Sequence, residues 1–145
     1  MVQYNGQELE IQRFYFTGTT TLAEGQILAY QELTTGTTKG LGVDVEVLSS
    51  DNITVPAGIV PLNMDGVIGP GYIDLIVPRR GDIIKVLCDG TTDVVALSSL
   101  LTPDATLAGL AVDGSVTDAD AMVFRSLTAF TTNATLTLLD CYCIN

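Results

Sequence analysis

The sequence has 145 residues, of which 47% are hydrophobic, and its 17 Asp and Glu against 6 Lys and Arg give a formal net charge of −11. That length suits one domain with its own core. Nucleic acids and anionic membranes are bound by clustered cations, so the acidic balance excludes both as direct partners. The sequence also lacks an apolar run of about 20 residues, the length that a transmembrane helix needs.

In chain order, residues 1–10 (MVQYNGQELE) are mostly polar and predict an N-terminal arm that adds little to folding. Residues 11–145 are predicted to form a single β domain, because short β-prone runs alternate with turn residues about every 8–12 positions. The predicted strands are IQRFYFTG, QILAYQE, VDVEVLSS, AGIVPL, GYIDLIV, DIIKVLC, DVVALSSLL, TLAGLAV, AMVFRSL and ATLTLLDCYCI.

This pattern predicts an all-β fold, a compact and mainly antiparallel β-barrel or β-sandwich with at most one or two short helices. TDADAMVFRSLTAF can alternatively be read as a short helix that begins at Thr117 or Asp118. TTGTTKGLG, residues 34–42, predicts an exposed loop.

The stretch VPRRGDIIKV, residues 77–86, contains the Arg-Gly-Asp tripeptide of integrin ligands, but its residues favour a corner between two strands. Pro78 suits the second position of a type I turn, and Gly81 can take the left-handed conformation that closes a hairpin loop. Asp82 is expected to accept hydrogen bonds from nearby backbone N–H groups or to pair with an arginine. Arg79 and Arg80 are also candidates for contact with an acidic partner surface.

The residues that carry most enzyme chemistry are sparse. The sequence has no histidine, which removes the commonest general base and most zinc sites. Cys88, Cys141 and Cys143 are predicted to be small buried residues, reduced and without metal, with Cys141 and Cys143 on the same face of one strand. We therefore predict no enzyme activity, no cofactor and no metal.

Two groups of acidic residues have alternative interpretations. Asp113, Ser115, Asp118 and Asp120 are clustered in VDGSVTDAD, but their spacing differs from that of an EF-hand loop, which leaves a solvated turn as the first interpretation and a calcium site as the second. Asp44 and Glu46 in VDVEV could imitate a glycosidase carboxylate pair. Their alternation with valines instead indicates the outer face of a strand.

Several stretches between Leu22 and Asp93, and one near the end of the chain, resemble the capsid cement, or head decoration, proteins of tailed bacteriophages. They are LAEGQILAYQE, VPAGIV, GVIGPGYIDLIVPRRGDIIKVLCDGTTD and AFTTNATLTLLDCYCIN. The resemblance implies a β-rich structural protein on the outer surface of the mature capsid, made in the host cytoplasm. It also implies a homotrimer and the major capsid protein as its partner.

The first candidate capsid contacts lie in the polar arm, at Val2, Gln3, Tyr4 and Gln7, and the second at Arg79 and Arg80. The alternative is a free-standing β-sandwich that binds carbohydrate or a tail or host surface. Such modules commonly present exposed aromatic platforms. This sequence has no Trp, and its five tyrosines are scattered along the chain at positions Tyr4, Tyr15, Tyr30, Tyr72 and Tyr142.

Overall fold

The computed structural model describes residues 2–4, 7–31, 44–48, 56–89, 100–104, 109–112, 122–128 and 137–144. Its strands are β1 (Val2–Tyr4), β2 (Gln7–Leu9), β3 (Ile11–Phe16), β4 (Ile27–Tyr30), β5 (Asp44–Val47), β6 (Pro56–Ile59), β7 (Gly71–Ile76), β8 (Ile83–Asp89), β9 (Leu100–Asp104), β10 (Gly109–Val112), β11 (Phe124–Ser126) and β12 (Thr137–Cys143). One short 3-10 helix, η1 (Leu62–Met64), precedes β7. No helix in this described part is long and apolar enough to cross a membrane.

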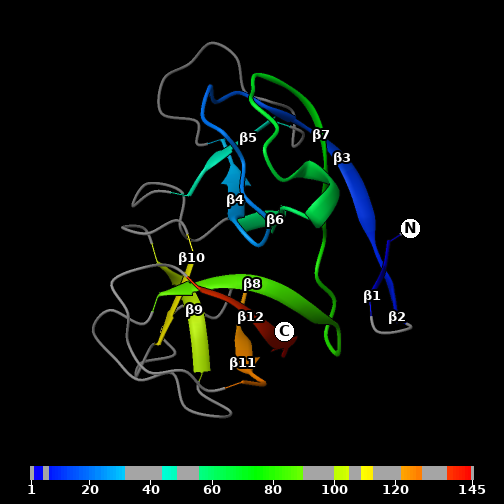
Figure 1. Cartoon of the computed structure of the whole chain (residues 1–145), viewed down its shortest axis with the longest axis vertical. Coiled ribbons are helices and arrows are strands. Elements are labelled where there is room, and N and C mark those ends of the chain that lie inside the picture. Colours follow the sequence, from blue (N-terminus) through cyan, green and yellow to red (C-terminus); the bar gives the residue numbers. More distant parts are fainter. Residues whose placement is uncertain are drawn as a thin grey trace.

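The strands form two five-stranded barrels and one separate hairpin (Figure 1). The first barrel has the strand order β3-β5-β4-β6-β7 and the second has the order β10-β8-β12-β11-β9. We call them the N-terminal and C-terminal barrels. Strands β1 and β2 pair with each other as a two-stranded sheet. The prediction of a mainly β fold is confirmed, and of the two predicted architectures, barrel and sandwich, the structure has the barrel.

Alternation of buried and exposed side chains along β3 and β7 explains which residues form the core of the N-terminal barrel. Phe14 and Phe16 of β3 and Ile73 and Leu75 of β7 point inward and pack in one core cluster. The other residues of β3 and the intervening residues of β7 are more exposed, as the period of two in a strand requires. The barrel closes between β6 and β7, where Ile76 pairs with a single residue of β6.

The C-terminal barrel is built on the long antiparallel pair β8 and β12. Ile84, Val86 and Cys88 alternate as buried residues along β8, and Cys141 and Cys143 do so along β12. The prediction that the last two cysteines share one buried face is confirmed. Strand β11 occupies the region for which a helix was the alternative, so the helical interpretation is wrong over Phe124–Ser126. Residues 117–121 and the predicted loop 34–42 lie outside the described residues.

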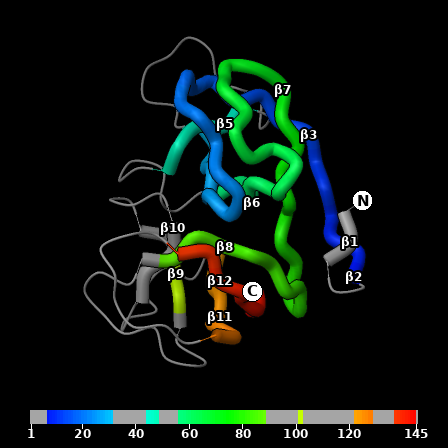
Figure 2. Tube along the Cα trace, in the orientation of Figure 1, coloured from blue at the N-terminus to red at the C-terminus, as the bar shows by residue number. Residues whose placement is uncertain are grey.

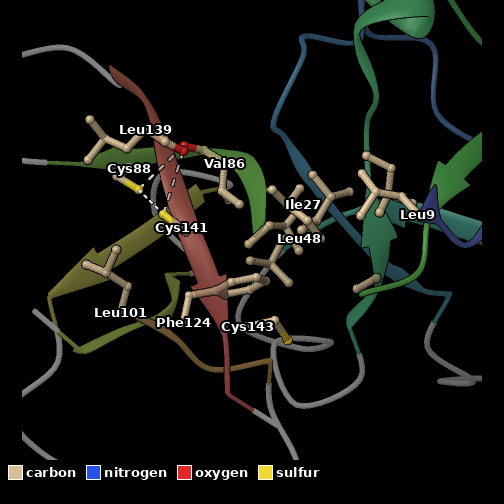
Figure 3. Packing of buried hydrophobic residues seen from close by; sticks show 14 residues of the cluster. Leu9, Ile27, Leu48, Val86, Cys88, Leu101, Phe124, Leu139, Cys141 and Cys143 are labelled. Atoms are coloured by element: carbon tan, nitrogen blue, oxygen red, sulfur yellow. Dashed lines mark hydrogen bonds between the residues drawn. The ribbon is translucent and has the colours of Figure 1, made fainter. Parts of the chain in front are cut away.

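One hydrophobic cluster joins the two barrels. It combines Ile27 and Ile59 of the N-terminal barrel with Val86 and Phe124 of the C-terminal barrel, and Leu9 of β2 belongs to it (Figure 3). A backbone hydrogen bond also crosses between the barrels, from the N–H of Leu87 to the carbonyl of Gly25 over 3.0 Å. The division of the chain into an arm and a single β domain stays a prediction, although Leu9 is only 1% exposed and is built into this shared core.

The Arg-Gly-Asp corner connects the two barrels. β7 pairs within the N-terminal barrel and β8 within the C-terminal barrel, so the predicted strands and corner are correct but the predicted hairpin is not. Figure 2 shows the chain running from β7 through this corner into β8. The hydrogen-bonded turn begins two residues later than a turn with Pro78 at its second position, since the N–H of Asp82 donates to the carbonyl of Arg79. Gly81, with φ +98°, takes the expected left-handed conformation.

Candidate functional site

The corner cluster, which comprises Gln7, Arg79, Arg80 and Asp82, gathers residues from distant parts of the chain. The side chain of Gln7 extends from β2 across the corner. Its Nε2 donates to Asp82 Oδ1 over 3.1 Å and to the carbonyl of Gly81 over 3.3 Å, while its Oε1 accepts from the N–H of Ile83 over 3.0 Å. An amide offers both donors and an acceptor, which explains how one side chain satisfies three partners.

Asp82 is the buried anion of the corner cluster, with 3% of its surface exposed. Its Oδ2 accepts from the backbone N–H of Arg79 over 2.8 Å and lies 3.6 Å from the Nε of the same residue. Its backbone carbonyl also accepts from the N–H of Cys143, at the end of β12. The predicted role of Asp82 as a local acceptor is confirmed, and its burial shows that the Asp of the tripeptide is built into the fold.

The two arginines differ in their surroundings. The side chain of Arg79 is 54% exposed but engaged, since its Nη2 donates to the carbonyl of Glu8 over 2.9 Å and its Nε lies 3.6 Å from Asp82 Oδ2. Arg80 is exposed, and in the described part of the chain no hydrogen bond or ion pair engages its guanidinium. Both arginines are therefore accessible, but Arg79 contacts β2 and Asp82, whereas in the described part of the chain the guanidinium of Arg80 is left for a partner.

The other predicted contact residues lie in β1, whose backbone pairs with β2. Val2 pairs with Leu9, Gln3 with Glu8, and Tyr4 with Gln7. Through β2, which Gln7 and Arg79 anchor, β1 is fixed next to the corner. The two predicted groups of contact residues are thus connected through β2, although they are far apart in sequence.

A second surface was missed by sequence reasoning. On the outer side of β3 and β7, Arg13 lies directly opposite Asp74, and Tyr15 directly opposite Tyr72. Arg13 Nε donates to Asp74 Oδ1 over 3.1 Å, and this hydrogen bond raises the pKa of Arg13 above its ordinary value. The tyrosine rings meet edge to face, with centroids 5.2 Å apart and planes at 76°. We call these four residues the tyrosine platform.

The cysteines lie inside the C-terminal barrel. Cys88 Sγ is 3.9 Å from Cys141 Sγ, and all three thiols are buried and unbridged (Figure 3). The hydrogen bond with Cys141, together with burial, raises the pKa of Cys88 far above that of a free thiol. Such a thiol stays protonated and unreactive at neutral pH, which agrees with the prediction that these cysteines act as core residues.

The acidic candidates are only partly described. Asp44 and Glu46 are half-buried residues of β5, beside the buried Val45. Asp113, Ser115, Asp118 and Asp120 lie outside the described residues. Within the part that the structure describes, no group of three or more His, Cys, Asp or Glu side chains could hold a metal ion.

Comparison with known proteins finds no family model that matches this chain and no match among curated proteins.

Proposed function

We propose that this protein is a head decoration, or cement, protein of a tailed bacteriophage, which binds the outer surface of the mature capsid and stabilises its lattice. The resemblance is most specific over GPGYIDLIVPRRGDIIKVLCDGTTD, residues 69–93. The observation that best supports the proposal is that this segment includes the corner, where a partly buried network of hydrogen bonds joins β2 to the connection between the barrels.

In this proposal the corner cluster and β1 face the major capsid protein. Arg80 is exposed on a chain with few cations, so it suits an acidic patch on the capsid, where a planar guanidinium can bind a carboxylate through two hydrogen bonds. Gln7 and Arg79 hold β2 against the corner, because their side chains form hydrogen bonds with Asp82 and Glu8.

Binding of this protein would stabilise the capsid because binding and lattice assembly are thermodynamically linked. A protein that binds the assembled lattice and not its separate subunits shifts the equilibrium towards the assembled state. A homotrimer suits a three-fold lattice position, because each copy then meets an equivalent capsid surface. The net charge of −11 would keep decorated particles apart in solution.

The test is to mix the purified protein with expanded heads that lack it and to pellet the heads. The proposal requires saturable co-sedimentation and heads that better resist heat and chelation. If the protein stays in the supernatant at every concentration and the heads gain no resistance, the proposed function is wrong.

Two matched variants locate the contact. Arg80→Ala should weaken binding most at low salt, because exposed charges are screened as ionic strength rises. Arg125→Ala removes another exposed arginine, on β11 of the C-terminal barrel, and should leave binding unchanged. Equal effects of the two variants would remove the corner from the proposed contact.

Deletion of residues 2–4 is the appropriate test of β1. A longer deletion, of residues 2–10, would also remove the buried Leu9 and the hydrogen bonds of Gln7, and would therefore confuse loss of binding with loss of stability.

A further inference from the structure

The tyrosine platform lies on two neighbouring strands, β3 and β7, which run side by side along one margin of the N-terminal barrel (Figure 1). Because side chains alternate along a strand, Phe14 and Ile73 fill the core while the four platform residues project outward. The barrel core therefore fixes the backbone positions of the platform.

Tyr72 is the exposed aromatic residue of this surface, with 73% of its surface accessible. Tyr15 contacts it edge to face and is itself half-buried. A ring held by a neighbouring ring loses little conformational freedom when a ligand stacks on it, which lowers the entropic penalty of binding.

The ion pair of the platform supplies polar groups beside the rings. The bond between Arg13 Nε and Asp74 Oδ1 engages one of the five guanidinium N–H donors and one carboxylate oxygen. Within the described part of the chain, the remaining donors and the second oxygen are left for a ligand. A side-by-side donor and acceptor of this kind match two adjacent hydroxyl groups, each of which can donate and accept.

Charge narrows the class of ligand. The platform carries one positive and one negative group and is therefore neutral, whereas the whole chain carries −11. The negative field of the protein opposes polyanions. We propose that the tyrosine platform is a binding site for a neutral saccharide, whose apolar C–H face stacks on Tyr72 and whose adjacent hydroxyls bind Asp74 and Arg13. This site does not depend on capsid binding and would add a second binding activity to the protein.

The test is titration of the isotopically labelled full chain with maltohexaose, mannohexaose and chitotetraose, with amide shifts followed by NMR. A shallow site of one ring and one ion pair should bind at least one of them with a Kd on the order of 1 mM. The amides of Tyr72 and Asp74 should shift and saturate. Tyr72→Ala should weaken binding at least about tenfold, a loss of about 1.4 kcal/mol, while Tyr72→Phe, which keeps the ring, should retain it.

Tyr142→Ala is the matched control, because it removes an exposed tyrosine of the C-terminal barrel. It should leave binding unchanged. The proposal is overturned if none of the three saccharides binds at about 10 mM, roughly tenfold above the expected Kd. It is also overturned if Tyr72→Ala binds like the wild type or if polygalacturonate binds more tightly than the neutral saccharides. Shifts of the platform amides that depend on protein concentration without saccharide would instead assign the surface to a second copy of the chain.

Discussion

Replacing the buried carboxylate of the corner, in Asp82→Ala, should destabilise the protein by about 2–4 kcal/mol. Two hydrogen bonds to a charged acceptor are lost, from the backbone of Arg79 at 2.8 Å and from Gln7 Nε2 at 3.1 Å. Each is worth about 1.5–3 kcal/mol. The full sum is reduced, because Gln7 Nε2 keeps the carbonyl of Gly81 and Asp82 no longer has to be desolvated. The half-exposed guanidinium of Arg79 adds little.

Asp74→Ala is the matched control for this prediction. Asp74 also binds an arginine, but the side chains of Arg13 and Asp74 are 70% and 29% exposed. Exposed pairs contribute about 0.2–1 kcal/mol, so this variant should stay within about 1 kcal/mol of the wild type. Urea unfolding followed by circular dichroism measures both, provided that the m-value is unchanged.

A double-mutant cycle tests the proposed cause. Gln7→Ala and Asp82→Ala remove opposite ends of one hydrogen bond, so the double variant should lose at least about 0.5 kcal/mol less than the sum of the single variants. If Asp82→Ala costs no more than Asp74→Ala, or if the two corner variants are additive, the corner network does not stabilise the fold as described.

Three further predictions concern backbone conformation and the buried thiols. Gly81→Val should lower the free energy of unfolding by about 2 kcal/mol, because φ is +98°, although a new side chain would meet open space. Gly71→Val is the control, with equally open space and an ordinary φ, and should stay within about 0.5 kcal/mol of the wild type in urea unfolding. Gly25→Ala should lower the free energy of unfolding by at least about 2 kcal/mol, because φ is +81° and the new methyl group would lie 2.8 Å from a backbone nitrogen of β8. An unchanged melting temperature would contradict the described contact between the barrels. The hydrogen bond with Cys141 and burial raise the pKa of Cys88, so its contribution to stability is complete below the pKa of an unfolded thiol, about 8.5, and is lost at up to about 1.4 kcal/mol per pH unit as the pH rises above it. Urea unfolding of the wild type and of Cys88→Ala at several pH values tests this. As the pH rises above about 8.5, the free energy of unfolding should fall less in the variant than in the wild type.

The sequence alone determined the features that depend on neighbouring residues. Alternation in VDVEV predicted β5, with Val45 buried, and the spacing of Cys141 and Cys143 predicted their shared face. Gly81 was predicted to take a left-handed conformation, because a glycine without Cβ is the residue that adopts it at least cost. These signals are local, because each depends only on the residues of one strand or one turn.

Local sequence signals did not predict the exact position of the corner turn or the role of residues 7–10. The turn at the corner lies two residues later than Pro78 suggested, because Gly81 takes the left-handed conformation and the N–H of Asp82 donates to the carbonyl of Arg79. Residues 7–10, QELE, are mostly polar and have too short a pattern to predict a strand. Only the folded chain provides the buried site for Leu9 and the three partners of Gln7.

The tertiary structure decided which strands pair. GYIDLIV and DIIKVLC are consecutive and equally β-prone, yet they become β7 and β8 of different barrels. Alternation specifies which face of a strand is buried but does not specify its neighbour, since that choice depends on how all strands together bury their apolar faces. For the same reason the sequence showed only scattered tyrosines. Tyr15 and Tyr72 meet because the pairing of β3 with β7 places them opposite each other, and that register is a property of the whole barrel.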